Sequence, residues 1–498
     1  MSKYQREKSE KEVENLAQDQ RKWWILSVTS LGALLSSLNF STLIIALPEL
    51  IRGLHATVFQ AMWIMLAYMV AQTVVVLLAG SIADRVGRKR LYMLGMIMFT
   101  IVSFVSGFAG SASMLIIWRI LQGGSGAILI ALSTAIVADA FPKKELGRAL
   151  GINITIVAIG QIIGPVLGGW LTTAYGWEWT FWFNVPFGVI SVLWGLWAMG
   201  FAKEKVASEA KKFDLGGLIT YVLSVTGLLL TLTWGPLQTW NSPIVWLSAA
   251  AFLICFPIFI LIERKHPSAL LHIPLLLYRT FSMGVYSGAL NALVRMAIMF
   301  MLIFYYQGVM AYDALKAGIL LIPLAVGMLI FAPISGWIGD RFGEVVPATL
   351  GLIISMGGLV GLTMNANADS SYVYQAIWMI VISIGSGLFN SPNTGSVMNA
   401  AGPNYRGEAS GILSLLQNVG MIFSIALVMP IITSNIPKDA MMAIFSGTMV
   451  GLDGAAASMS GFIHGLHIVF YSMAALLIVA AVMSYFRKSK NGEVLKSH

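Results

Sequence analysis

Two arginines stand inside long apolar segments of the chain, where a charged side chain needs a polar environment. Arg119 lies about a third of the way into the segment 112–140, and Arg295 lies near the centre of the segment 281–307. In a bilayer each guanidinium must face a cavity or a partner, because contact with lipid is costly. Arg119 can have a structural role, bonded to Gln122 and to backbone carbonyls. Arg295 either lines the path of a substrate or makes a structural pair.

Several amides also lie inside apolar segments. With the two arginines they form the candidate substrate cavity: Asn39, Arg119, Gln122, Asn291, Arg295, Asn390, Asn393 and Gln417. None of the 22 acidic residues lies deep in a segment, so a buried proton-carrying carboxylate is not predicted. We expect any pH dependence to come from the substrate or from groups near segment ends, such as Glu49 and Asp139. His464 and His467 are either a second titratable pair or ordinary interfacial residues.

The sequence contains no constellation typical of catalysis or of a bound cofactor. It has neither a Gly-x-x-x-x-Gly-Lys-Ser/Thr loop nor a His-Glu-x-x-His motif, and its one cysteine, Cys255, rules out a disulfide framework or a Cys-based zinc site. We therefore expect no enzyme activity, no cofactor and no metal. The missing phosphate loop also argues against ATP-driven pumping by this chain alone.

The composition places these side chains in a membrane protein. Of the 498 residues 57% are hydrophobic and 11% are charged, whereas about a quarter of the residues of a soluble domain are charged. Fourteen apolar segments are long enough to cross a hydrocarbon core of about 30 Å as helices, which predicts an all-α polytopic membrane protein. They are 23–50, 57–80, 91–110, 112–140, 147–173, 179–202, 214–235, 243–263, 281–307, 312–338, 345–364, 372–400, 407–434 and 462–486.

Positive charges are concentrated on one side of these segments. If the N-terminus and every second loop are cytoplasmic, that side carries 26 of the 31 Lys and Arg residues and the other side carries 3. This bias predicts a protein of the cytoplasmic membrane with both termini in the cytoplasm. It also explains the net charge of +9, so we expect the lipid bilayer and not nucleic acid as the partner. Residues 1–22 are too long and too acidic for a cleaved signal, and the first segment is expected to remain as an anchor.

The second part of the chain repeats the first. Residues 80–87 recur as 336–343 at an offset of 256, and residues 147–152 recur as 407–412 at an offset of 260. Two six-helix halves related by a pseudo-two-fold axis along the membrane normal are a transporter architecture, with substrate bound between the halves near the midplane. The predicted organisation is a cytosolic tail 1–22, a six-helix half 23–202, a linker 203–275 with two inserted transmembrane helices, a six-helix half 276–486 and a cytosolic tail 487–498.

Four stretches resemble motifs of the major facilitator superfamily, and within it of the fourteen-helix drug/proton antiporter family: 80–90, 119–126, 160–169 and 177–186. The resemblance covers nearly the whole chain after residue 22. The stretch 119–126 resembles the fourth-helix Arg motif, which implies a coupling role for Arg119 as the alternative to a structural one. The resemblance as a whole implies a monomeric secondary transporter that exports amphipathic or drug-like small molecules by alternating access, coupled to an ion gradient such as that of protons. The alternatives are an exporter or facilitator of organic anions, suggested by the two arginines, and a membrane ligand sensor that does not transport.

The resemblance assigns conformational gating to residues of these motifs and of the second-half repeat: Gly80, Asp84, Arg85, Gly87, Arg88, Gly160, Gly164, Pro165, Gly168, Asp340 and Arg341. The loop residues would latch the two halves in one state; the alternative is a tight turn with positive-inside charges. The glycines spaced by four line one helix face and allow another helix to approach closely. That contact is either a sliding seal of the cavity or static packing.

The chain departs from the family at two membrane-embedded positions. Asn39 stands where the family's first span has an Asp, and Gln417 stands where its thirteenth span often has an Arg. Both the anion and the cation are thus neutralised, which preserves the local charge balance. We expect Arg295 to face a central cavity near the amides of the candidate set.

Overall fold

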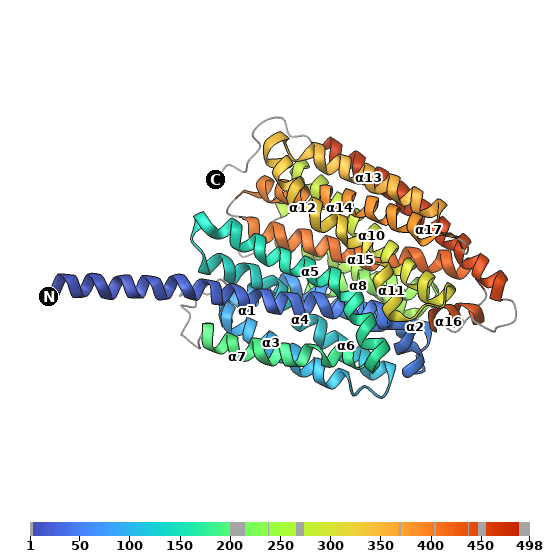
Figure 1. The fold of residues 1–498 in the computed structure, drawn as a ribbon, viewed down its shortest axis with the longest axis horizontal. Helices are drawn as coiled ribbons and strands as arrows, with labels where there is room; N and C mark the ends of the chain where they lie inside the picture. Colours follow the sequence, from blue (N-terminus) through green and yellow to red (C-terminus); the bar gives the residue numbers. More distant parts are fainter. Residues whose placement is uncertain are drawn as a thin grey trace.

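A computed structural model describes residues 3–199, 215–237, 239–264, 273–367, 370–402, 405–436, 438–446 and 455–487. These residues form a bundle of long helices that run along one axis, and none of them is in a β-strand (Figure 1). Fourteen helical segments among them are long and apolar enough to cross a membrane. The predicted fold class and the predicted number of spans are therefore confirmed.

The first half contains six spans. They are α1 (Lys3–Gly53), α2 (Val58–Val86), α3 (Arg88–Ser106), α4 (Ala112–Ala140), α5 (Lys143–Tyr175) and one span made of α6 (Trp179–Trp182) and α7 (Asn184–Met199). The start of α2 is defined by a capping box, in which Thr57 and Gln60 each accept a hydrogen bond from the other's backbone. The charged segment before the first span continues α1 as helix, because Lys, Glu and Gln favour that conformation.

Two inserted spans, α8 (Leu215–Leu237) and α9 (Pro243–Glu263), and the short helix η1 (Ile273–Leu277) precede the second half. That half consists of α10 (Arg279–Phe304) with the π-helical turn η2 (Tyr305–Val309), α11 (Ala314–Leu320), α12 (Pro323–Phe342), α13 (Val345–Met364), α14 (Tyr372–Ala401), α15 (Arg406–Asn435), α16 (Lys438–Ser446) and α17 (Ala455–Phe486). The boundaries predicted for α4, α9 and α13 agree with the structure. α17 starts at Ala455 and not at 462, because a run of alanines extends the helix.

The sequence repeat is also a repeat of packing. In the first half α1 packs against α5, α2 against α4, and α3 against α7; in the second half α10 packs against α15, α12 against α14, and α13 against α17. The turn before the third span of each half is made by a glycine with positive φ, Gly87 at 96° and Gly343 at 89°. Other residues rarely adopt this conformation, so the backbone itself explains why a glycine recurs 256 residues later.

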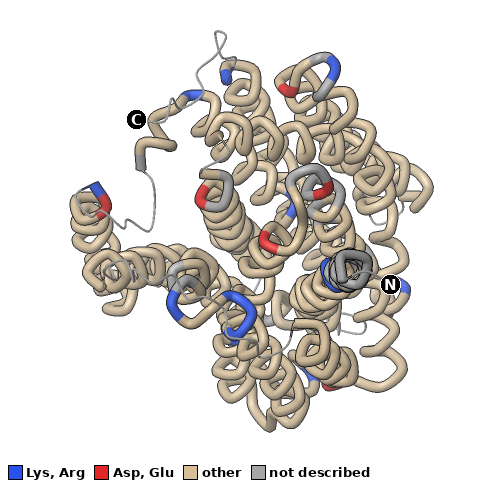
Figure 2. Tube along the Cα trace, turned by 90° about the vertical axis from the view of Figure 1, so that its left-hand side faces the viewer, with Lys and Arg blue, Asp and Glu red and all other residues tan. Residues whose placement is uncertain are grey.

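The two faces of the bundle can be named from the first and last helices. We call the side on which α1 begins and α17 ends the terminal face, and the opposite side the distal face. The first turns of α1 project beyond the bundle on the terminal face (Figure 1). Figure 2 looks onto this face and shows Lys, Arg, Asp and Glu at helix ends.

The inserted hairpin of α8 and α9 lies over the seam between the halves. α8 packs against α2 of the first half and against α15 of the second half. Its Tyr221 is buried in an apolar cluster with Leu78 of α2 and Leu413 of α15, and the Tyr221 hydroxyl donates to the carbonyl of Thr73 on α2 at 3.0 Å. α9 exposes large apolar side chains such as Trp246, as expected of a helix in contact with lipid.

Tyr221→Phe is expected to lower the free energy of unfolding by about 1 kcal/mol, because it removes one buried hydrogen bond and keeps the apolar ring. The measurement is denaturant or thermal unfolding of the purified protein in detergent micelles. Tyr286→Phe is the matched control, since the Tyr286 side chain of α10 is exposed. Equal stability of the two variants would mean that the Tyr221 hydroxyl contributes nothing to docking of the hairpin.

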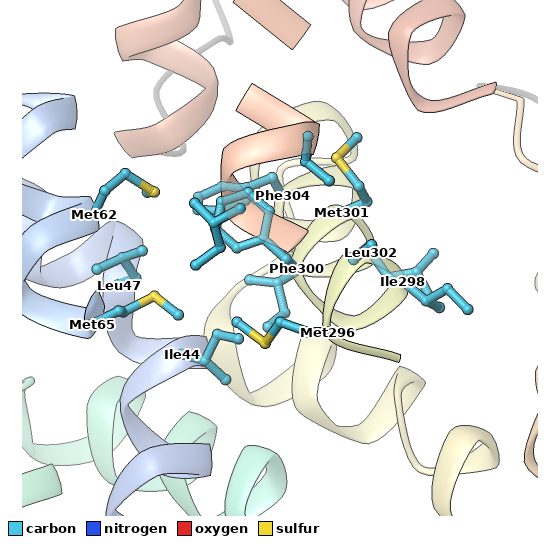
Figure 3. Packing of buried hydrophobic residues seen from close by; sticks show 14 of the residues in the cluster. Ile44, Leu47, Met62, Met65, Met296, Ile298, Phe300, Met301, Leu302 and Phe304 are labelled. Atoms are coloured by element: carbon cyan, nitrogen blue, oxygen red, sulfur yellow. The ribbon is translucent and has the colours of Figure 1, made fainter. Parts of the chain in front are cut away.

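An apolar cluster joins the two halves near the distal face. Side chains of α1 and α2 face side chains of α10 across the seam (Figure 3). All of the following members are buried: Ile44, Leu47, Met62, Met65, Met296, Phe300 and Phe304. Because both halves contribute to one cluster, burial of its surface stabilises the arrangement in which they meet on the distal side.

Candidate functional site

Arg295 lies between the two halves. It belongs to α10, and its Nη2 donates to Oε1 of Gln161 on α5 of the first half at 3.5 Å. The Arg295 side chain is half-buried and the Gln161 side chain is exposed, so both retain accessible surface. Within the described residues Gln161 is the only hydrogen-bond partner of Arg295, and no carboxylate forms an ion pair with it. The seam therefore presents a cation whose charge is not neutralised by an acid of the described chain.

The amides of the second half make their described contacts within that half. Gln417 of α15 is half-buried and lies against α10, and Asn291 is buried on α10 itself. Asn390 of α14 is half-buried and donates to a carbonyl of its own helix. None of these three amides forms a hydrogen bond with Arg295 among the described residues. The hydrogen-bond partner of Arg295 is instead Gln161, from the other half.

Arg119 lies inside the first half and is fully buried. Its Nε donates to the carbonyl of Ile64 on α2 at 3.1 Å. Its Nη1 donates to Oδ1 of Asn39 on α1 at 2.5 Å and to Oε1 of Gln122 at 2.7 Å. The ring of Tyr68 covers the guanidinium at 4.2 Å. Three of the predicted cavity residues thus form one buried network that links α1, α2 and α4.

Asn393 belongs to a second buried network, near the terminal face. Its Nδ2 donates to the carbonyl of Gly284 on α10 at 3.0 Å, and its Oδ1 accepts from Nη1 of Arg487 at 2.5 Å. Arg487 directly follows α17, is fully buried and also donates to the carbonyl of Glu344 at 3.3 Å. Burial lowers the pKa of Arg487 to about 10, a shift that nearby Glu344 opposes, so the guanidinium stays protonated at neutral pH. Although Arg487 falls in the predicted tail, it is part of the bundle.

Three glycines of α5 pack against α1 of their own half. A Cβ atom at Gly164 would lie 1.9 Å from Oγ of Ser41, and Gly160 and Gly168 also face α1 at contact distance. The glycines therefore allow the two helices to approach each other closely. The described contacts of these three residues are made within the first half.

The close contact between the halves is made one residue further along α5. A Cβ atom at Gly169 would lie 2.4 Å from the carbonyl oxygen of Ala314, at the start of α11. In return, a Cβ atom at Gly318 of α11 would lie 2.5 Å from the carbonyl oxygen of Pro165. Two helices of different halves thus touch backbone to backbone near the distal face.

Two hydrogen bonds also join the halves near this contact between α5 and α11. Nε2 of Gln307 in η2 donates to the carbonyl of Ile45 on α1 at 2.9 Å, and the backbone N–H of Leu315 donates to Oγ1 of Thr173 on α5 at 3.3 Å. Beside these contacts lies a pocket of about 350 Å³ whose lining comes from both halves: Pro48, Glu49, Arg52, Thr172, Thr173, Gln307, Ala311, Tyr312, Asp313 and Ala314. The described residues therefore hold the halves together on the distal face.

Gln307→Leu is expected to shift the protein toward conformations that are open on the distal face. The hydrogen bond to Ile45 crosses between the halves, and its loss removes about 1 kcal/mol from the closed state, about a 5-fold change in population. The shift is measured as the distance between spin labels on cysteines at the distal ends of α5 and α11, in a Cys255→Ser background. Gln60→Leu, which removes a cap within α2, serves as control; distance distributions that match in both variants would contradict the prediction.

On the terminal face, the first residue of α3 makes an ion pair within its own half. Nη1 of Arg88 lies 2.9 Å from both carboxylate oxygens of Asp139, at the end of α4. The equivalent positions of the second half carry Glu344 and Asn399, and Nδ2 of Asn399 donates to Oε1 of Glu344 at 2.8 Å. Both halves thus have a polar contact at this position. It is an ion pair in the first half and a hydrogen bond between an amide and a carboxylate in the second half.

The remaining gating candidates lie near the same face. Gly80, Arg85 and Arg341 are exposed at the ends of α2 and α12. A Cβ atom at Gly80 would meet open space, so this glycine is not required by a close contact in this conformation. The side chains of Asp84 and Asp340 lie outside the described part of the structure.

Sequence reasoning missed Gln161, Gly169 and Gln307. The first two lie inside the stretch 160–169, but the sequence pattern pointed only to the glycines spaced by four and not to the residues beside them. Their position on the seam follows from the helix rotation of 100° per residue, once one residue of α5 is known to face α1. For Gln307 the signal was a lone amide at the end of an apolar segment.

The two six-helix halves meet at a seam that carries both polar and apolar side chains. The sequence profile of the Major Facilitator Superfamily matches residues 29–425. The chain belongs to this superfamily and is a membrane transporter, not an enzyme.

Several characterised or named proteins are similar to this chain. The riboflavin transporter RibZ of Clostridioides difficile (strain 630) is 31% identical over 406 residues, which is 82% of this chain and 87% of the relative. The tetracenomycin C resistance and export protein of Streptomyces glaucescens is 27% identical and covers 95% of this chain and 93% of its own. The multidrug resistance protein Stp of Mycobacterium tuberculosis (strain CDC 1551 / Oshkosh) is 29% identical and covers 80% and 74%.

A solved structure shares the fold. The bacterial homolog of the human lysosomal transporter Spinster, in an inward-facing and unoccupied conformation, superposes with a TM-score of 0.63 at 16% identity. The match covers 94% of this chain and 97% of the other.

Proposed function

We propose that the protein is a secondary active exporter of amphipathic small molecules, which it moves by alternating access of its two halves. The observation that carries the proposal is the Arg295–Gln161 contact, in which a charged and a polar side chain from opposite halves meet at mid-span. A substrate bound there touches both halves, so its binding can be coupled to their relative motion. The similarity to a resistance and export protein of Streptomyces glaucescens supports the direction of transport.

The chemistry of the seam favours a substrate with a large apolar part. Methionines of α2, Met62 and Met65, lie across the seam from Phe300 and Phe304 of α10 (Figure 3). The two phenylalanines follow Arg295 along α10 toward the distal face. Such side chains adapt to ligands of different shape, because methionine is flexible and polarisable. The polar contribution comes from Arg295, Gln161 and the half-buried Gln417.

Within this proposal, organic anions are the second substrate class. Arg295 has only a neutral amide as a partner within the described residues, so an anionic group on the substrate would stabilise it. The similarity to a riboflavin transporter supports planar, polar ring systems as candidates. A ligand sensor without transport is less well supported, because the relatives named above are transporters or resistance proteins.

Topology and coupling are part of the same proposal. We place both termini in the cytoplasm and the protein, as a monomer, in the cytoplasmic membrane, on the bias of Lys and Arg toward the terminal face. Export then runs from the terminal face to the distal face. Coupling to an ion gradient such as protons is proposed, with titration at the mouths of the pathway or on the substrate.

The test is substrate flux in proteoliposomes, with and without an imposed pH gradient. One panel contains cationic, neutral and anionic amphipathic dyes of similar size, and protein-free liposomes provide the control for leak. We expect flux that saturates with dye and rises when the gradient is imposed. Flux equal to that of the control for every dye would sink the exporter proposal and leave the sensor.

A further inference from the structure

The network around Arg119 brings two buried donors together without acceptors. Nη2 of Arg119 and Nδ2 of Asn39 are buried, and neither has a hydrogen-bond partner within the described residues. Nη1 of Arg119 donates to Oδ1 of Asn39, so the two unbonded groups, Nη2 and Nδ2, lie near each other inside the first half. Buried donors nearly always have a hydrogen-bond acceptor in folded proteins, so we expect a bound acceptor next to these two groups.

The same place lacks a negative charge. The acceptors that Arg119 does have are the carbonyl of Ile64 and the amide oxygens of Asn39 and Gln122, and all are neutral. No carboxylate of the described chain forms an ion pair with it. A fully buried guanidinium without a counter-charge is strongly disfavoured in a membrane interior.

We propose that Arg119 and Asn39 bind a small inorganic monovalent anion of the chloride class. The anion accepts from Nη2 of Arg119 and from Nδ2 of Asn39 and neutralises the guanidinium. Because the ring of Tyr68 covers one face of the guanidinium, the anion lies in the guanidinium plane, where the N–H groups point. A water molecule could accept from the same donors, but it would not neutralise the positive charge of the Arg119 guanidinium.

The ion is a resident part of the first half and is separate from the transported substrate. Arg119 and Asn39 are at most 1% exposed, whereas Arg295 at the seam keeps accessible surface. The inference therefore does not depend on which substrate is exported, and it is tested on the folded protein without transport.

The experiment compares thermal unfolding of the purified full-length protein in sodium gluconate with increasing chloride at constant ionic strength. Gluconate is too large for the enclosed place, so chloride is the only small anion present. A ligand that binds only the folded protein stabilises it by mass action, and chloride at 100 times its dissociation constant raises the folded-to-unfolded ratio about 100-fold. We expect an unfolding temperature that rises with chloride concentration. An unfolding temperature that does not change with chloride concentration would overturn the proposal.

Asn39→Asp is the decisive variant, because it puts a carboxylate where Oδ1 already contacts Arg119. In gluconate we expect it to be as stable as the wild-type protein in chloride, and to show no further response to chloride. Arg119→Gln is expected to lose the response as well. If that variant fails to fold, the Asn39→Asp comparison still decides the question.

Arg295→Gln is the matched control for binding of chloride to the other arginine inside a membrane span. Its site is at the seam and not in the Arg119 network, so it is expected to keep the full chloride response. A response that survives in Asn39→Asp, or that disappears in Arg295→Gln, contradicts the assignment to Arg119 and Asn39.

Discussion

Gly169→Leu is expected to hold the distal face open and to abolish most transport, while the protein still folds. A Cβ atom at this position would lie 2.4 Å from the carbonyl oxygen of Ala314, a backbone atom that cannot rotate away. The two helices can then meet only if α5 and α11 move apart. Overpacking of this kind costs about 1–3 kcal/mol, which shifts a two-state equilibrium about 5- to 150-fold.

Gly164→Leu is the matched control. It lies on the same helix, but its neighbour is Ser41 of α1 in the same half. We expect this variant to lower the yield and the unfolding temperature of the protein, because packing inside the half is lost. The pair of variants separates a contact that moves during transport from a contact that holds one half together.

Two measurements distinguish the variants. Distances between spin labels at the distal ends of α5 and α11 are expected to lengthen in Gly169→Leu, and dye flux is expected to fall at normal yield. Gly318→Leu is expected to reproduce this result from the other side of the contact, because it faces the carbonyl of Pro165 at 2.5 Å. If Gly169→Leu transports normally with unchanged distances, the contact between α5 and α11 does not gate the distal face.

Helix positions could be predicted from the sequence because their signals are local. The segments 112–140, 243–263 and 345–364 coincide with α4, α9 and α13, since each is a long apolar run bounded by polar or helix-capping residues. The repeat of Gly87 as Gly343 also has a local cause, the positive φ of the turn. These features depend on hydrophobicity and backbone conformation, which neighbouring residues determine.

The faces of the helices could not be predicted in the same way. Gly168 and Gly169 are adjacent, yet one contacts α1 of the first half and the other contacts α11 of the second half. A helix turns by about 100° per residue, so the role of each glycine depends on a rotation that an all-round apolar helix does not reveal. Arg487 was assigned to a tail for a related reason: its burial depends on acceptors supplied by Asn393 and Glu344, far away in sequence.

The repeat reveals a difference between the halves at the centre of the membrane. Asn39 and Arg295 are 256 residues apart, so they occupy equivalent positions in the first span of each half. In the first half this position is an amide that binds Arg119 inside the bundle, and in the second half it is a cation at the seam. At the proposed substrate site the charge therefore comes from the second half, while Gln161 of the first half contributes a neutral amide.

Arg295→Ala is expected to change which substrates are carried, with the largest loss for anionic ones. A hydrogen bond between charged groups contributes about 1.5–3 kcal/mol, so the affinity for an anionic dye should fall about tenfold or more. Neutral and cationic dyes lose no charge contact and are expected to be affected less. Arg295→Lys is expected to retain only part of the anionic transport, because an ammonium cannot form the planar, two-pronged contact of a guanidinium.

Gln161→Glu gives the sharpest comparison, because it places a carboxylate beside Arg295 without removing the arginine. At 3.5 Å the new side chain would form an ion pair across the seam and compete with an anionic substrate for the guanidinium. We expect anionic dyes to be transported less well than by the wild-type protein, with cationic dyes unchanged or improved, whereas Gln161→Leu should leave the charge preference as it is. The measurement is the flux of the three dye classes in proteoliposomes. If Arg295→Ala and Gln161→Glu both keep the wild-type order of substrates, Arg295 makes a structural pair and does not face the substrate.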